Sequence, residues 1–314
     1  MTLQQLRYLC EVVRQDLNIS KAAAALAVSQ PGLSRQLQRL ERELEVELFV
    51  RNRKRLVRLS EAGAEIHRIA QHTLESARNI REAAREHAGE HHGSLTIATT
   101  HTQARYALPG VIRRFAQRYP DVQLSLRQGT PADVSYLVIS GAADLSIATE
   151  PIEPPADLVF LPCYQLQRIV LTPAGHPLLK EKRLTLEKLA AYPLITYDYA
   201  FIARSKTINA FAARGITPNI VLNAIDADVI KTYVEFGLGI AIVPDMAYVP
   251  TRDKALRAIE AKHLFEPNTI QVGIRRNHYL RGYTYAFIEM FAPHLKRAVV
   301  EKAIAESATR RTRA

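Results

Sequence analysis

Three side chains between residues 30 and 35 have the chemistry needed to read DNA bases. Gln30, Ser34 and Arg35 are expected on one exposed leading face of a short helix. Glutamine can pair bidentately with adenine and arginine with guanine, while serine can contact bases or phosphate. An alanine-rich stretch precedes this helix, which is typical of two short helices that cross closely in a helix-turn-helix. A plain helical pair with a solvated polar face is the alternative.

A basic segment follows the predicted helical pair. Five of the eight residues in Arg51–Arg58 are Lys or Arg, and apolar stretches on both sides suggest a short hairpin or wing. Arg51 and Arg53 in such a wing would bind phosphates beside the bases that the helix reads. The whole chain is also basic, with 42 Lys and Arg against 31 Asp and Glu and a formal net charge of +11. Both features favour double-stranded DNA as a partner.

A second polar group follows a predicted strand at residues 95–99. It consists of Thr100, His101, Thr102 and Gln103. Hydroxyls, an amide and free backbone N–H groups at the start of a helix form a cradle for an anion. Thr149 ends the third predicted strand of the same lobe, at the carboxyl edge where open sheets bind ligands. Ordinary helix-cap and turn roles are the alternative for these residues.

Residues 1–59 are expected to fold into the helices and wing that carry the DNA-reading side chains. Apolar residues recur at helical spacing near the N-terminus, and a second helix is predicted to begin after Ser20. Ser29 is predicted to cap the third helix, with Pro31 in its first turn. Both Ser29 and Pro31 therefore lie beside the predicted DNA contacts.

Residues 60–92 are expected to form one long helix that Ser60 caps, followed by a polar linker. Several apolar residues of this helix fall near the a and d positions of a heptad, which predicts a modest two-chain coiled coil. Packing of the helix on its own domain is the alternative.

Beyond residue 93, strands alternate with helices, which predicts parallel or mixed sheets with helical crossovers. We expect residues 93–295 to form two α/β lobes with a cleft between them. The first lobe takes about 93–162 and 266–295, and the second about 163–265. Residues 296–314 are expected to be a disordered basic tail. The predicted fold class is a mainly α N-terminal winged helix-turn-helix, a long linker helix and a two-lobed α/β effector domain.

Composition disfavours several other classes of protein. Only two cysteines occur, Cys10 and Cys163, which excludes a disulfide scaffold and fits a reducing cytoplasm. We find no apolar run of membrane-spanning length and no export signal. Three histidines near the linker, His87, His91 and His92, are interpreted as solvated rather than metal-binding. Because no spacing suggests a nucleophile with its base, neither an enzyme nor a metal or other cofactor is expected.

Residues 1–90 resemble the winged helix-turn-helix and linker helix of LysR-type transcriptional regulators. The resemblance rests on Leu6, the alanine run, Ser29-Gln-Pro31, Ser34, Leu40-Glu41, Leu48-Phe-Val-Arg51 and Ala62-Gly63, and it extends over nearly the whole chain. It implies that the two lobes are similar to periplasmic substrate-binding proteins and hold a small inducer. It also implies a cytoplasmic dimer of dimers on promoter DNA, away from membranes, with RNA polymerase as a further partner.

Longer motifs are similar to the CysB/Cbl branch of this family, whose members regulate sulfur assimilation. These motifs are Thr99–Pro109, Ile147–Glu150, Leu161–Tyr164 and Asp226–Tyr233. The branch responds to acetylserines, sulfate, thiosulfate or related metabolites, among which we include adenosine 5′-phosphosulfate. Positions that match Thr100, Thr102, Gln103 and Thr149 contact the anionic inducer in the branch.

One position departs from the pattern of the branch. Its sulfate site also uses a threonine in the second lobe, and this chain has Ile202 there. Isoleucine cannot donate a hydrogen bond to an oxyanion, although Arg204 or Ser205 could compensate. Sulfate is therefore expected to bind weakly, or a larger and less polar sulfur compound to be preferred.

Three other functions remain open from the sequence. The chain could be a LysR-type regulator of an unrelated pathway. It could be a solute-binding protein for anions with an incidental helical N-terminus, which would have no affinity for DNA. It could also be an α/β enzyme that uses His101 or the pair Asp226 and Asp228, although the aspartates are better suited to capping a helix.

Overall fold

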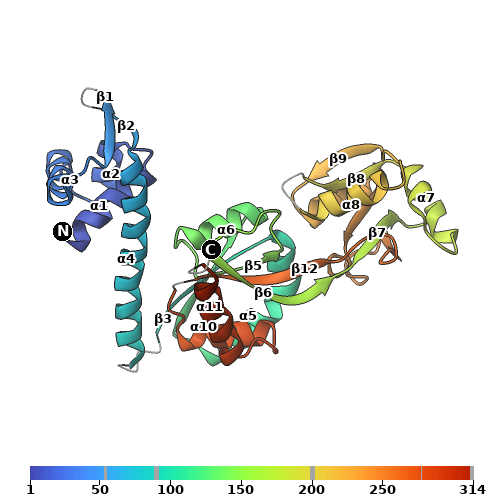
Figure 1. The fold of residues 1–314 in the computed structure, drawn as a ribbon. Helices are drawn as coiled ribbons and strands as arrows, with labels where there is room; N and C mark the ends of the chain where they lie inside the picture. The colour runs from blue at the N-terminus through green and yellow to red at the C-terminus, as the bar shows by residue number, and fades with distance from the viewer. Residues whose placement is uncertain (53–54, 88–91, 199–201, 277, 312–314) are drawn as a thin grey trace. The chain divides into compact units, whose positions relative to one another are not determined.

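The computed structural model describes residues 1–52, 55–87, 92–198, 202–276 and 278–311 (Figure 1). The chain divides into two compact units. The first comprises Met1–Gly89 and Asn277–Tyr279, and the second comprises Glu90–Arg276 and Leu280–Ala314. Within the described ranges, no helix is long and apolar enough to cross a membrane.

The first unit begins with three helices, α1 (Leu3–Arg14), α2 (Ile19–Ala25) and α3 (Gln30–Leu44). Ser29 caps α3 as predicted, because its Oγ accepts a hydrogen bond from the backbone N–H of Gly32 at 3.2 Å. The predicted cap of α2 was wrong. Asn18 takes that role by accepting from the N–H of Lys21 at 3.0 Å, and Ser20 already lies in the first turn of the helix.

The predicted wing is present as an antiparallel hairpin of β1 (Phe49–Asn52) and β2 (Arg55–Leu59). The long helix α4 (Glu61–His87) follows directly, and Ser60 caps it by accepting from the N–H of Gly63 at 2.8 Å. The helices and the hairpin share one hydrophobic core. It includes Leu9, Val12, Leu33, Leu37, Leu40, Leu48 and Phe49.

The start of α4 lies so close to the hairpin that residue 63 has no room for a side chain. A Cβ on Gly63 would lie 1.9 Å from the carbonyl oxygen of Leu48. Gly63→Ala is therefore expected to destabilise the first unit by about 1–3 kcal/mol, as overpacked sites do. Thermal unfolding monitored by circular dichroism measures this loss.

The matched control is Gly110→Ala in α5 (Leu108–Arg118), a helix of the second unit. The nearest atom to a Cβ there is a guanidinium nitrogen of Arg114 at 3.8 Å, which is ordinary contact. This variant should leave stability unchanged or raise it slightly, because alanine favours helix over glycine. Equal losses for both variants would contradict the steric explanation for Gly63.

The second unit contains two five-stranded sheets. The first sheet has the order β4-β3-β5-β12-β6 and the second has the order β11-β7-β10-β8-β9. The strands of the first are β3 (Gly93–Thr99), β4 (Val122–Gln128), β5 (Leu145–Thr149), β6 (Leu158–Leu166) and β12 (Asn268–Arg275). Those of the second are β7 (Arg168–Pro173), β8 (Leu194–Tyr197), β9 (Ile220–Ala224), β10 (Ile240–Pro244) and β11 (Leu256–Glu260). Each sheet mixes parallel and antiparallel pairs, as the alternation of strands and helices predicted.

Helices accompany each sheet. The first lobe has α5, α6 (Pro131–Ile139) and α10 (Gly282–Phe291), and the second has α7 (Leu186–Ala190), α8 (Ile202–Ala212) and α9 (Ala227–Glu235). The chain passes between the sheets twice, at Gln167 and through residues 261–267. The first sheet thus keeps the chain up to Leu166, a few residues beyond the boundary expected near residue 162. Strand β6 escaped prediction because Pro162 interrupts its pattern, where the register against β12 shifts.

The C-terminal segment is not the disordered tail that its basic composition suggested. Arg297–Arg311 forms helix α11. Val300 is fully buried, and Ala303 and Ile304 pack against the core of the first lobe. The prediction was wrong because these apolar residues at helical spacing determine the fold of the segment, while the basic residues gather at its end.

Candidate functional site

The predicted base-reading side chains lie in the first turns of α3. Ser29, Gln30, Pro31 and Arg35 are exposed, and Ser34 is half-buried. The opposite face of the helix is buried through three leucines, Leu33, Leu37 and Leu40. The helix is therefore fixed by its apolar face, while its N-terminal polar groups remain accessible, as recognition of a major groove requires.

The wing is joined to α3 through Glu41. One carboxylate oxygen of Glu41 lies 2.6 Å from Nη2 of Arg51, and the other accepts from the backbone N–H of Leu48 at 3.0 Å. Arg51 is thus held in place while its side chain stays partly exposed. Arg53 lies outside the described residues. Arg55 and Arg58 on β2 are exposed and extend the basic surface.

The predicted anion cradle lies at the carboxyl end of β3. Thr100, Thr102 and Gln103 are all buried there. The helix that follows begins at His101 and passes through a π-helical turn, η1 (Gln103–Ala107). Such wide turns occur often at functional sites. This start places the first N–H groups of the helix, which have no partner inside it, among the cradle residues.

Thr149 lies at the same edge of the sheet, because β3 and β5 are parallel neighbours. Its Oγ1 is buried, and no other described residue forms a hydrogen bond with it. The nearby Thr99 differs, because its Oγ1 donates to the carbonyl of Ile147 at 2.7 Å. A buried hydroxyl without a partner costs about 1–3 kcal/mol. Thr149 therefore has the free hydrogen-bonding capacity of a ligand-binding residue.

Side chains of the second lobe meet this edge. Burial raises the pKa of Tyr197, at the end of β8, to about 12, and the neighbouring Thr102 side chain and Arg168 charge offset this rise only in part. The Gln103 amide Nε2 lies 3.8 Å from the sulfur of Met246 in the second lobe, while its Oε1 accepts from the hydroxyl of Tyr164, on β6 of the first lobe, at 2.6 Å. Thr102 and Gln103 thus lie where the two lobes touch.

The His101 ring contacts the second lobe. Its Nε2 lies 3.1 Å from Oδ2 of Asp228 on α9. The same carboxylate accepts from the Tyr106 hydroxyl at 2.6 Å and pairs with Arg105 at 3.2 Å and Lys231 at 3.1 Å. Partial burial alone would raise the pKa of Asp228, but hydrogen bonds from Tyr106, His101 and Lys231 hold that pKa well below its usual range. These groups form a polar cluster that joins the lobes.

Sequence reasoning missed most of this cluster. Asp228 and Lys231 share one face of α9, but their partners in the first lobe are more than a hundred residues away, and no local pattern connects them. Asp226, by contrast, caps α9 by accepting from the N–H of Val229 at 2.8 Å, as its position indicated. The two aspartates are therefore engaged separately, which disfavours a catalytic pair.

The remaining predictions concern Ile202, Cys163 and the absence of a metal site. Ile202 is the first residue of α8, and its side chain lies outside the described part of the structure. Burial raises the pKa of the Cys163 thiol to about 12, which disfavours a reactive thiolate. Over the described ranges, no three His, Cys, Asp or Glu side chains gather as metal ligands would. His91 is outside those ranges.

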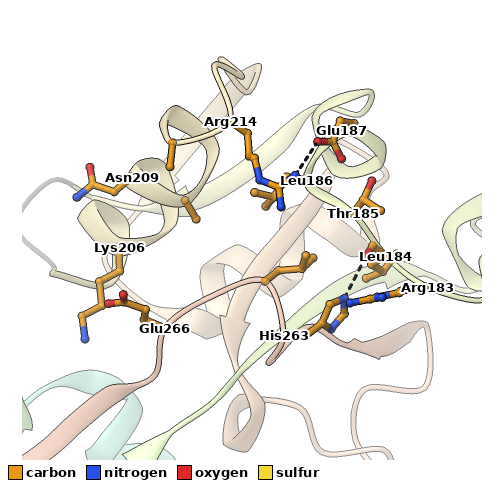
Figure 2. Close-up of a pocket in the computed structure, with 13 residues that line it drawn as sticks. Arg183, Leu184, Thr185, Leu186, Glu187, Lys206, Asn209, Arg214, His263 and Glu266 are labelled. Carbon is orange, nitrogen blue, oxygen red and sulfur yellow. Dashed lines mark hydrogen bonds and ion pairs between the residues drawn. The ribbon is translucent and has the colours of Figure 1, made fainter.

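A hollow of about 740 Å³ lies elsewhere in the second lobe, beside α7 and α8 (Figure 2). It contains none of the predicted effector residues. Two of its polar side chains are engaged within the protein: Arg214 pairs with Glu187 at 3.8 Å, and the ring of His263 bonds to the carbonyl of Leu184 at 3.0 Å. The buried hydroxyl of Thr149, which lacks a partner, lies at the meeting edges of the lobes and not in this hollow.

Comparison with protein families gives two matches. The family described as "LysR substrate binding domain" matches residues 88–296. The family described as "Bacterial regulatory helix-turn-helix protein, lysR family" matches residues 3–64. Together they match parts of both units, including the predicted recognition helix and both lobes.

Individual relatives match over almost the full length. The HTH-type transcriptional regulator SsuR of Burkholderia cenocepacia is 48% identical over 307 residues, which are 98% of this chain and 100% of that protein. The HTH-type transcriptional regulator CysB of the same organism is 48% identical and covers 97% of each chain. Among solved structures, the cofactor-binding domain of the Cbl transcriptional regulator has a TM-score of 0.65 and 41% identity, over 68% of this chain and 93% of that one.

Proposed function

Because this chain belongs to the LysR family of helix-turn-helix transcriptional regulators, we propose that it controls genes of sulfur assimilation in the cytoplasm. Its similarity to SsuR, CysB and Cbl supports that pathway, for cysteine synthesis or for the use of organosulfur compounds. Members of this family act as regulators rather than enzymes. The signal that this regulator senses is a small anionic metabolite of the same pathway.

The protein binds promoter DNA as an oligomer in this proposal. Each α3 enters a major groove with Gln30 and Arg35 at the bases, and the wing holds flanking phosphates. Exposed apolar residues support self-association. On α4, Ile80 is 71% exposed, and Phe236 after α9 is 81% exposed beside Tyr233 and Val229. Large apolar side chains at two separate surfaces fit a dimer formed through α4 that pairs again through the α/β domains.

The effector binds where the lobes meet, on Thr100, Thr102, Gln103 and Thr149. The unpartnered hydroxyl of Thr149 carries this assignment, because an oxyanion would supply the missing partner. The chain crosses between the lobes at Gln167 and through residues 261–267, so a ligand that touches both lobes can bias how they close. A changed closure alters subunit packing and, through it, the spacing or bend imposed on DNA.

A thermal-shift titration tests the effector site. Sulfate, thiosulfate, O-acetylserine, N-acetylserine and adenosine 5′-phosphosulfate are added separately at constant ionic strength. One of them should stabilise the protein selectively, by about 2.7 kcal/mol at 100 times its Kd. We expect sulfate to be weaker than a larger ligand because residue 202 is isoleucine.

Thr102→Ala should abolish the selective shift. The matched control is Thr232→Ala, because this exposed threonine bonds to the carbonyl of Asp228 within α9 and lies outside the proposed site. A shift that survives in Thr102→Ala would place the ligand elsewhere. No shift with any of the five compounds would overturn the sulfur effector and leave membership of the family intact.

A further inference from the structure

A buried arginine lies at the crossing between the two lobes. Arg168 is the first residue of β7 and is only 2% exposed. Its Nη2 donates a hydrogen bond to Oδ1 of Asn268, the first residue of β12. Because the chain crosses between lobes just before each of these residues, the pair ties the two crossings together. Burial lowers the pKa of Arg168, but a guanidinium keeps its charge in proteins.

Arg168 places an excess of positive charge in the buried region between the lobes. The half-buried carboxylate of Glu150 acts on the Arg168 charge, but Lys206 of α8 already pairs with that carboxylate at 2.7 Å. No carboxylate of the described residues forms an ion pair with Arg168, and Asp245, which also acts on its charge, is exposed to solvent. Arg168 therefore has no carboxylate of its own as an ion-pair partner. A buried charge without a counter-charge is costly, unless something else neutralises it.

This excess charge adjoins the proposed effector site on two sides. Glu150 directly follows Thr149, whose Oγ1 is the buried hydroxyl without a partner. The charge of Arg168 also acts on Tyr197, and both this charge and the Thr102 side chain lower the pKa of Tyr197. The positive charge and the free hydroxyl are separate observations, and both point to the same missing group, a small anion that accepts hydrogen bonds.

We propose that Arg168 supplies the counter-charge for the anion held by Thr102 and Thr149, and that it makes the site select doubly charged ligands. The inference rests on the proposed effector site and adds its charge preference. Arg168 is a specificity-determining residue in this account, acting from behind the hydroxyls that touch the ligand. Its Coulomb attraction falls slowly with distance in a buried site, so direct contact is not required.

Isothermal titration of the full chain tests this inference, with sulfate and thiosulfate as dianions and O-acetylserine as a zwitterion. Arg168→Gln removes the charge and keeps a side chain that can bond to Asn268. It should weaken binding of the dianions about tenfold more than binding of the zwitterion. Arg168→Lys should retain most of the preference. Glu150→Gln increases the excess charge and should strengthen binding of the dianions.

Arg168→Gln and Glu150→Gln should change the affinity for the dianions in opposite directions. Structural damage would instead weaken binding in both variants, so the comparison distinguishes charge selection from a structural role. Arg275→Gln is the matched control: this buried arginine at the other end of β12 donates to the carbonyls of Val138 and Ala143. It should leave the ratio of affinities unchanged. Equal losses for all ligands in folded Arg168→Gln would overturn the inference, even if Thr102→Ala still abolishes binding. If the wild type binds none of these ligands, the proposed effector site is overturned as well.

Discussion

Thr149→Val should stabilise the ligand-free protein and remove its response to the effector. Valine has nearly the shape of threonine, so the substitution removes a hydroxyl that no described residue bonds to. Relief of this buried polar atom is worth about 1 kcal/mol, which corresponds to about 2–4 °C in a domain of this size. The effector would lose a hydrogen bond from its charged oxygen, which costs about 1.5–3 kcal/mol, or ~10–150-fold in affinity. Differential scanning calorimetry with and without ligand measures both effects.

Thr99→Val is the matched control for this experiment. It removes the neighbouring hydroxyl that donates to Ile147 at 2.7 Å, and it leaves that carbonyl without its side-chain partner. This variant should be destabilised, and its ligand-induced shift should persist. If Thr149→Val destabilises the ligand-free protein as much as Thr99→Val does, the Thr149 hydroxyl has a structural partner and is not free for a ligand.

Arg35→Ala should reduce discrimination between promoter DNA and random duplex. A bidentate contact from arginine to guanine is worth about 1–3 kcal/mol of discrimination, or ~5–150-fold. Arg51→Ala, in the wing, should instead weaken binding to both duplexes by a similar factor. It should also reduce the slope of log K against log salt by about 0.9, the value for one phosphate contact. Fluorescence anisotropy at several salt concentrations measures these quantities.

Arg118→Ala is the control for total charge, because this exposed arginine lies on α5, outside the DNA-binding unit. It should leave binding to both duplexes unchanged. If Arg35→Ala and Arg51→Ala lose the same factor on promoter and random DNA, the assignment of α3 to bases and the wing to phosphates is wrong.

Local signals in the sequence were sufficient to predict most elements of the first unit. Ser29 and Ser60 cap the helices expected of them, because a hydroxyl before an apolar periodic run satisfies the first free N–H groups. The same rule failed at α2, where Asn18 and Ser20 are both good caps and only the fold decides between them. The prediction failed at α11 for a different reason, because the basic composition was given more weight than a short apolar pattern.

The interlobe site could be predicted only in part. Thr100, Thr102, Gln103 and Thr149 follow strands of one sheet, so the rule for carboxyl edges locates them together. Their counterparts in the second lobe carry no such signal. His101 and Asp228 are 127 residues apart. In the sequence, nothing distinguishes Arg168 from the many other basic residues. Its burial at the crossing follows from how the two sheets are connected, which spacing along the chain does not reveal.

In our proposal, an anion between the lobes changes how this regulator binds promoter DNA. The most direct test measures anisotropy of a promoter fragment from upstream of sulfur-assimilation genes, against a random duplex, with and without the compound that stabilises the protein. We predict that the compound alters affinity for the promoter and not for the random duplex, and that Thr149→Val removes this effect. Identical promoter binding with and without the compound, in protein that demonstrably binds it, would contradict the account.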